Sequence, residues 1–245
     1  EISQEYERYV KKIPRLQKFY WGEIKNINEK FDLVTLIHTL EHVPNPSLFL
    51  KKVHQLIKPG GLLLVQVPNY SQNAFDILVF EHISHFFPET LEQLFINTGF
   101  EVMVKSQQLV PKELTFIVKT ATADHTGKVD FTKALTKKMT LNIKILDEFS
   151  RVVDQAHKKK PLIVFGTAEV GTWVAGLLEG KLDFFVDESP WRVGKKHLGI
   201  PIKHPKVLRK GNNVILAMAP ILADQVYNKW KRTRASFFYP NLKSS

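Results

Sequence analysis

The stretch KFDLVTLIHTLEHVPNPSLFLKKVHQLIKPGGLLLVQVPN, residues 30–69, decides the fold. Residues 31–37 are almost wholly apolar, which predicts a strand covered on both faces of a parallel sheet. Asn45 and Pro46 suit the N-cap and the first position of a helix, which KPGG ends before a second apolar strand at 62–69. The order strand, helix, strand predicts a βαβ unit with a right-handed crossover.

Polar side chains interrupt this pattern where each strand ends. His38, Glu41 and His42 follow the first strand, and Pro68–Tyr70 closes the second. In open α/β sheets the ligand lies beyond the carboxyl ends of the strands, so we expect a site at this edge. A neutral imidazole accepts a proton near pH 7, which makes His42 a candidate catalytic residue, the alternative being a structural His bonded to the loop backbone. Glu41 is expected to brace the loop.

The rest of the chain continues as two α/β units. A short amphipathic helix is expected within residues 3–18, and alternating apolar residues at 99–121 predict an antiparallel pair of strands. A polar linker precedes a long amphipathic helix at 131–157. At Pro161 a buried strand restarts the pattern, and further strands and helices predict a second, smaller α/β unit.

Composition narrows the class of protein. The chain has 245 residues, of which 44% are hydrophobic and 24% charged, a normal globular balance. No apolar run approaches the roughly 18 residues that span a bilayer, so a cytoplasmic protein is expected. Cys is absent, which excludes disulfides, thiolate zinc sites and cysteine nucleophiles. The net charge of +11 suits phosphorylated ligands, but the basic clusters lack interleaved aromatic residues, which favours a small partner over nucleic acid. A solvated, Lys-rich surface is the alternative.

Several motifs together resemble a known family. LEHVPNP (40–46), IKPGG (57–61) and EHISHFFPETLEQLFINTGFEV (81–102) are similar to the second half of a class I S-adenosylmethionine-dependent methyltransferase. VDESPWRVGKKHLGIPI (186–202) resembles the C-terminal domain of sugar C-methyltransferases and the nucleotide-sugar-binding halves of some sugar acetyltransferases. The resemblance covers the whole chain, with the linker helix as its least informative part.

The resemblance implies an α/β fold: a Rossmann-like methyltransferase sheet, incomplete at the N-terminus, with a second, smaller Rossmann-like domain. It divides the chain into a methyltransferase domain at 1–120, a linker and bridging helix at 121–160, and the second domain at 161–245. The implied reaction is methyl transfer from S-adenosyl-L-methionine to a small acceptor, a nucleotide-linked sugar methylated on carbon, in polysaccharide biosynthesis. The alternatives are RNA methylation, another small-molecule O- or N-methylation, or non-catalytic binding of a nucleotide sugar. No metal is required, and the oligomeric state is not predicted.

The resemblance also implies where the cofactor binds. The implied cofactor-binding residues are Glu1 on the ribose hydroxyls, Glu23 near the adenine amino group with Trp21 and Ile24 beside it, and His38 close to the strand end. A chain terminus and a surface turn are the ordinary alternatives for Glu1 and Glu23. The family's Gly-rich GxGxG loop does not occur before residue 30, nor does the Cys-based zinc module of sugar C-methyltransferases. We expect the first strand and its Gly-rich loop to lie upstream of Glu1.

The resemblance also implies that the acceptor binds near the Glu-His pair that follows the second strand. C-methylation requires a base that removes a proton beside a keto group, and the resemblance assigns this to His82 supported by Glu81. The alternative is a structural segment that closes over the site. The loop LVPKEL replaces a His-Gly-Gly-like stretch of the family, which puts the sugar specificity in doubt. The remaining substrate-binding candidates are Tyr70, Asp187, Arg192 and Lys195.

The second unit carries a weak nucleotide signal. Gly166 and Gly171 bracket a strand-to-helix turn as G-x4-G instead of G-x-G-x-x-G. Asp187 ends the next strand, where a Rossmann fold places a ribose-binding acid, and Arg192 with Lys195 could meet a sugar pyrophosphate. A helper fold that packs against the first domain is the alternative.

Overall fold

The computed structural model describes residues 3–121 and 132–240. The chain divides into two compact units, and each is described by itself. The first unit consists of Glu1–Asn69 and Ile83–Phe131, and the second of Tyr70–His82 and Thr132–Ser245. Within the described ranges, no helix combines the length and the apolar character needed to cross a membrane.

The first unit is built on a four-stranded mixed sheet in the order β1-β2-β4-β3. β1 and β2 are parallel and are joined through α2, which confirms the predicted βαβ unit, while β2 pairs antiparallel with β4 and β4 with β3. The predicted antiparallel pair at 99–121 is therefore confirmed. The elements are β1 (Phe31–Ile37), α2 (Pro46–Gln55), β2 (Ile57–Pro68), α3 (Pro88–Asn97), β3 (Phe100–Ser106) and β4 (Glu113–Thr120), with short 3-10 helices η2 (Ile24–Asn26) and η3 (Leu40–His42).

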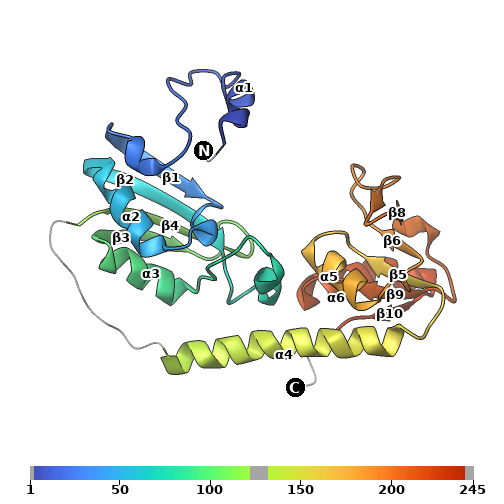
Figure 1. Cartoon of the computed structure of the whole chain (residues 1–245). Helices are drawn as coiled ribbons and strands as arrows, with labels where there is room; N and C mark the ends of the chain where they lie inside the picture. Colours follow the sequence, from blue (N-terminus) through green and yellow to red (C-terminus); the bar gives the residue numbers. More distant parts are fainter. Residues whose placement is uncertain (1–2, 122–131, 241–245) are drawn as a thin grey trace. The chain divides into compact units, whose positions relative to one another are not determined.

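Helices α2 and α3 pack against the same face of this sheet (Figure 1). The predicted cap of α2 is confirmed, because Asn45 accepts a hydrogen bond from the backbone N–H of Leu48 at 2.9 Å and Pro46 occupies the first turn. Alternate strand residues meet the two helices in one apolar core. Its fully buried members include Leu50, Leu63, Val65, Leu91, Phe95, Leu114, Phe116 and Val118.

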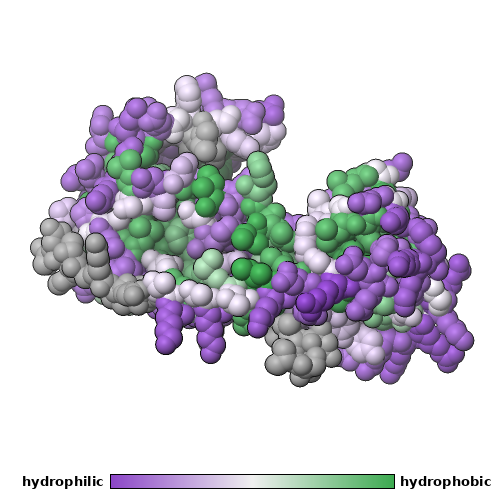
Figure 2. All heavy atoms as spheres, turned by 60° about the horizontal axis from the view of Figure 1, so that its bottom comes forward, coloured by the Kyte–Doolittle hydropathy of each residue, from purple (hydrophilic) through white to green (hydrophobic). Residues whose placement is uncertain are grey.

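The opposite face of the sheet carries apolar side chains that remain exposed. Figure 2 shows hydrophobic side chains, in green, at the surface among hydrophilic ones. Leu33 and Ile37 on β1 are each 54% exposed, and Leu33 pairs with the exposed Leu62. The prediction that residues 31–37 are covered on both faces is wrong. Among the described residues, β1 is an edge strand that pairs with β2 alone, and both α2 and α3 lie on the other face.

The expected helix within residues 3–18 is much shorter. The chain forms only η1 (Gln4–Tyr6) and a single turn, α1 (Glu7–Val10). Tyr6, Tyr9 and Ile13 are each at least 45% exposed, so this apolar face packs against no core of the described residues. Short helices without such packing are marginal in water, which explains the early end.

The second unit contains a six-stranded sheet in the order β10-β9-β5-β6-β8-β7. The first five strands of that order are parallel, and β7 alone pairs antiparallel, with β8. The sequence did not predict β7 and β8. The strands are β5 (Leu162–Phe165), β6 (Phe184–Val186), β7 (Lys196–His197), β8 (Ile200–Lys203), β9 (Asn213–Leu216) and β10 (Ser236–Phe238).

Helices cover both faces of this second sheet. Leu162 and Val164 face α4 (Thr132–Ala156) and α5 (Glu169–Leu177), whereas Ile163 and Phe165 face α6 (Pro220–Trp230). α4 confirms the long helix predicted at 131–157. The chain builds outward from β5 through β6 to β8, then returns to place β9 on the other side of β5. β5 and β9 therefore form the switch point of a doubly wound sheet. The 3-10 helices η5 (Pro205–Val207) and η6 (Lys231–Thr233) lie in its connections.

Residues 70–82, which follow β2, are built into the second unit. Their 3-10 helix η4 (Ala74–Leu78) places Phe75 edge-on against Phe149 of α4, with ring centroids 5.4 Å apart. Asn142, also on α4 and 4% exposed, donates a hydrogen bond to the backbone oxygen of Tyr70 at 2.7 Å. Residues 70–82 are thus fixed by the core of the second unit, although the rest of that unit begins only at Thr132.

Candidate functional site

The carboxyl end of β1 holds an imidazole between two carboxylates. His38 has a left-handed backbone, with φ +47°, and its N–H donates to the Gln66 oxygen at 2.9 Å. Its Nδ1 lies 3.2 Å from Glu41 Oε1, and its Nε2 lies 3.7 Å from Glu113 Oε1. Non-glycine residues at positive φ are uncommon and cluster at functional sites, so this strand end is a candidate ligand edge.

Glu41 anchors the loop that follows. Its backbone oxygen accepts hydrogen bonds from the N–H groups of Ile83 and Ser84, at 2.9 and 3.0 Å. Its side chain is fully buried, and Oε2 accepts no hydrogen bond from the residues that the structure describes. A buried carboxylate oxygen without a donor is costly, and a cationic ligand nearby would lower that cost. His42, in the same 3-10 helix, donates its backbone N–H to Thr39 at 3.2 Å, and its chemical role stays a prediction.

The predicted adenine-binding residues lie in the loop before β1. Trp21 is 55% exposed, Gly22 has φ +86°, and Ile24 packs against the core of the first unit. The Glu23 carboxylate is exposed and pairs with Lys25 at 2.9 Å. That partner holds the pKa of Glu23 below its usual range, so the side chain is an ionised acceptor at neutral pH. Glu1 lies outside the described residues.

These groups fit S-adenosyl-L-methionine chemically. An exposed indole offers a flat apolar surface for a purine, and a nearby ionised carboxylate accepts from an exocyclic amino group. The carboxylates around His38 suit a ligand that carries positive charge. The individual contacts remain proposals.

The carboxylate that contacts the His82 ring is that of Asp76, a residue that the sequence did not point to. Nδ1 of His82 lies 2.8 Å from Asp76 Oδ1, and the two side chains are 12% and 2% exposed. Glu81, the predicted support, is an exposed residue. η4 and the turn after it bring position 76 back to position 82. No short motif signals that pairing.

Tyr70 is buried at 3% exposure among residues of the second unit. Burial raises the pKa of its phenol, although a hydrogen bond with Asn142 opposes part of that rise. The phenol is therefore protonated near neutral pH. Its predicted contact with the substrate stays a prediction.

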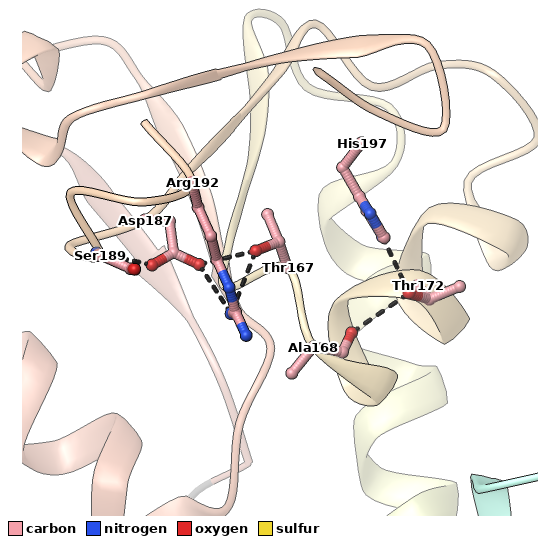
Figure 3. A network of polar contacts seen from close by, with 7 residues as sticks. All are labelled: Thr167, Ala168, Thr172, Asp187, Ser189, Arg192 and His197. Atoms are coloured by element: carbon pink, nitrogen blue, oxygen red, sulfur yellow. Dashed lines mark hydrogen bonds and ion pairs between the residues drawn. The ribbon is translucent and has the colours of Figure 1, made fainter. Parts of the chain in front are cut away.

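Asp187 and Arg192 meet at the carboxyl end of β6, in the network of Figure 3. Asp187 Oδ2 accepts from the Thr167 hydroxyl at 2.7 Å and from Arg192 Nη1 at 3.2 Å, and Oδ1 accepts from the Ser189 N–H at 2.9 Å. Burial alone would raise the pKa of Asp187, but these hydrogen bonds together outweigh it and hold the pKa below its usual range. Asp187 was predicted to bind a ribose, but both of its carboxylate oxygens already accept hydrogen bonds from the protein.

The shape of the turn between β5 and α5 explains why Gly166 and Gly171 are both glycine. Gly166 has φ +104°, which side chains rarely adopt, and a Cβ on Gly171 would lie 2.2 Å from the Gly166 oxygen. The turn therefore reads G-x-A-x-x-G, with Ala168 at the position that is Gly in the dinucleotide fingerprint. His197 lies nearby, its Nε2 2.8 Å from the Thr172 hydroxyl (Figure 3). Lys195 lies exposed in the loop that carries Arg192.

We expect Asp187 to make the stability of the second unit acid-sensitive. Its folded pKa is depressed, so it contributes stability above its unfolded value of about 4, and that contribution is lost as the pH falls through the folded pKa. Asp187→Asn should cost about 1–3 kcal/mol at pH 7, and the difference from the parent should shrink in acid. Urea unfolding between pH 7 and pH 3 measures both, with Asp154→Asn, at an exposed position of α4, as the control. If the difference in unfolding free energy between the parent and Asp187→Asn does not vary with pH, the predicted acid sensitivity is wrong.

A cavity of about 610 Å³ lies elsewhere in the first unit. Lys30, which precedes β1, and Ile57, which begins β2, are among its lining residues. It therefore opens at the amino ends of the parallel strands, the edge opposite His38. The side chains discussed above do not line it.

Comparison with known proteins supports a functional class for the first unit. Residues 4–104 match a family model described as a methyltransferase domain. A ubiquinone biosynthesis O-methyltransferase of Pseudomonas syringae pv. tomato is 37% identical over 62 residues, 24% of this chain and 27% of that protein. The protein of the same name from Chelativorans sp. is 26% identical over 125 residues, 49% of this chain and 47% of that protein. The chain thus spans less than half the length of either relative.

Solved methyltransferase structures also align with this chain. An S-adenosylmethionine-dependent methyltransferase from Clostridium acetobutylicum is 16% identical, with a TM-score of 0.41 over 49% of this chain and 73% of that one. The S-adenosylmethionine-dependent methyltransferase from Mesorhizobium loti is 15% identical, with a TM-score of 0.40 over 48% of this chain and 76% of that one.

Proposed function

We propose that the chain, whose residues 4–104 form an S-adenosylmethionine-dependent methyltransferase domain, transfers a methyl group to a small acceptor. The match of this segment to the methyltransferase family model carries the proposal. When bound, S-adenosyl-L-methionine supplies an electrophilic methyl group on a sulfonium. In the proposal, Trp21, Glu23 and Ile24 hold the adenine, and Glu1 holds the ribose. His38, at the end of β1, lies near the reacting part of the cofactor.

His82 is proposed as the base. Nε2 takes a proton from the acceptor, and the electron pair left behind forms the new bond to the methyl carbon. The bond between that carbon and sulfur breaks, and its electron pair stays on sulfur. His42 is proposed to orient the acceptor. An imidazole suits this work because its proton affinity lies near neutral pH.

The acceptor is proposed to be a nucleotide-linked sugar that is methylated on carbon. The second unit is proposed to be a Rossmann-like domain that contributes to binding this acceptor. Three features favour this: the doubly wound strand order, the G-x-A-x-x-G turn at Gly166 and the cationic loop of Arg192 and Lys195. Asp187 serves there by holding Arg192. The second candidate is O-methylation of a small molecule, which the ubiquinone-pathway relatives favour.

Product analysis separates the two candidates. The full-length gene product is incubated with methyl-labelled S-adenosyl-L-methionine and either a nucleotide-linked keto sugar or a small hydroxylated molecule. Labelled carbon attached to a sugar carbon supports the first candidate, and a labelled methyl ether supports the second. Absence of transfer to both would contradict both.

Cofactor binding gives the direct test of the first unit. We expect full-length protein to bind S-adenosyl-L-methionine in calorimetry and Glu23→Ala to weaken binding by a few-fold to about a hundredfold, the value of one hydrogen bond to a charged group. Glu29→Ala is the matched control, because Glu29 is also an exposed carboxylate paired with a lysine, Lys18, at 2.8 Å. Equal loss in both variants would remove the adenine role from Glu23. Absence of binding in the parent protein would contradict the enzyme proposal itself.

We also propose that a further part of the methyltransferase domain, with the Gly-rich loop, pairs with the edge of β1. The exposed side chains Leu33, Ile37 and Leu62 support this, because an apolar face of a sheet is stabilised only when another layer covers it. The outer edge of β1, which pairs with no strand in the part of the chain that the structure describes, supports it as well.

A further inference from the structure

We propose that Asp76 is the positioning residue for His82, and that it fixes which nitrogen of the ring can act as the base. This inference rests on the proposed function, because it assumes that His82 removes a proton from the acceptor. It adds a carboxylate that no motif in the sequence marks and replaces the expected support by Glu81.

The contact itself is short and buried. Asp76 Oδ1 and His82 Nδ1 are 2.8 Å apart, and the Asp76 side chain is 2% exposed. An ionised carboxylate only accepts hydrogen bonds, so Nδ1 must carry the hydrogen. The lone pair of the neutral ring is then on Nε2, the nitrogen that points away from Asp76. This is the tautomer that a general base acting through Nε2 requires.

Local structure sets the geometry of the pair. Asp76 lies within η4, where its N–H donates to the Asn73 oxygen at 3.2 Å and its oxygen accepts from Val79 at 3.1 Å. The N–H of His82 in turn donates to the Val79 oxygen at 3.0 Å. Val79 thus links the two residues through the backbone, and the six-residue separation closes without a long flexible loop.

The core of the second unit holds the residues that lead into this turn. Asn142 on α4 fixes the oxygen of Tyr70 at 2.7 Å, and the Phe75 ring packs edge-on against Phe149. Phe75 directly precedes Asp76, so the buried ring fixes the backbone from which the carboxylate projects. The His82 ring is therefore oriented by a carboxylate that is itself held by packing, as a preorganised catalytic group requires.

Two variants of the full-length protein test the inference. In Asp76→Asn, the new amide can donate to Nδ1, which would shift the hydrogen to Nε2 and remove the base. We expect kcat to fall by about 10²–10⁴-fold, with KM for S-adenosyl-L-methionine within about twofold of the parent. Glu81→Gln changes the adjacent, exposed carboxylate and should leave kcat within about twofold.

Nitrogen-15 NMR of the His82 ring gives a readout that needs no activity. We expect the parent and Glu81→Gln to show hydrogen on Nδ1, and Asp76→Asn to show it on Nε2. An Nε2–H tautomer in the parent overturns the inference even if Asp76→Asn does not fold. Parent-like tautomer and kcat in Asp76→Asn overturn it as well. If the parent transfers no methyl group but shows the Nδ1–H tautomer that Asp76→Asn reverses, the proposed function fails while the positioning role of Asp76 stands.

Discussion

Replacing His82 with Ala is expected to lower turnover by about 10²–10⁴-fold while S-adenosyl-L-methionine still binds with nearly the parent affinity. The physical reason is that the imidazole acts on the acceptor proton and contributes little to holding the cofactor, whose proposed contacts lie in the first unit. Single-turnover transfer of a labelled methyl group, measured beside calorimetric cofactor binding, separates the two effects.

His85→Ala is the matched control, because it removes an imidazole three positions further along the same stretch. We expect it to retain turnover within about an order of magnitude of the parent. Equal loss of cofactor binding and turnover in His82→Ala would assign a structural role to His82. Full activity in that variant would transfer the base role to His42 or to no side chain.

Phe75→Ala is expected to reduce the unfolding free energy of the protein by about 3–5 kcal/mol, the usual cost of deleting a buried aromatic ring. Phe75 is 4% exposed and contacts Phe149 in the core formed by α4, α5 and the second sheet. Removing the ring leaves a cavity at the point where residues 70–82 join that core. Urea unfolding followed by tryptophan fluorescence measures the loss, and Trp173, which packs on Phe149, reports on the same core.

Phe80→Ala provides the control in the same segment. Phe80 is fully exposed, so its removal should change the unfolding free energy by no more than about 0.5 kcal/mol. Similar losses in both variants would show that residues 70–82 are not held by the ring of Phe75.

Local signals predicted the parts of this fold that depend on neighbours in sequence. Asn45 and Pro46 marked the start of α2 because capping is decided within one helical turn. Alternation at 99–121 predicted the antiparallel pair because one face of that hairpin is buried. An apolar run, by contrast, does not reveal how many layers cover it, so the exposure of Leu33 and Ile37 could not be read from residues 31–37.

The candidate site shows the same limit. His38 and His42 stood out because they follow a strand end, and His82 stood out through the family resemblance. Asp76 lies in an apolar stretch and meets His82 through the turn at Val79. Adjacency in sequence favoured Glu81, whose side chain is exposed. The assignment of residues 70–82 to the second unit depends on packing against Phe149 and Asn142, more than sixty positions away, and no local pattern encodes such a contact.

The route of residues 70–82 has a consequence for how the protein is made. The core that contacts Phe75 includes Ile215 and Ala217, which lie more than a hundred positions further along the sequence. A ribosome adds about 5–20 residues per second, so the segment waits on the order of ten seconds between its own synthesis and that of its last packing partners. The first sheet can form its ladders during that interval, whereas the turn with Asp76 and His82 cannot complete its packing. We infer that the nascent chain acquires a competent base only after the residues through Ala217 have left the ribosome.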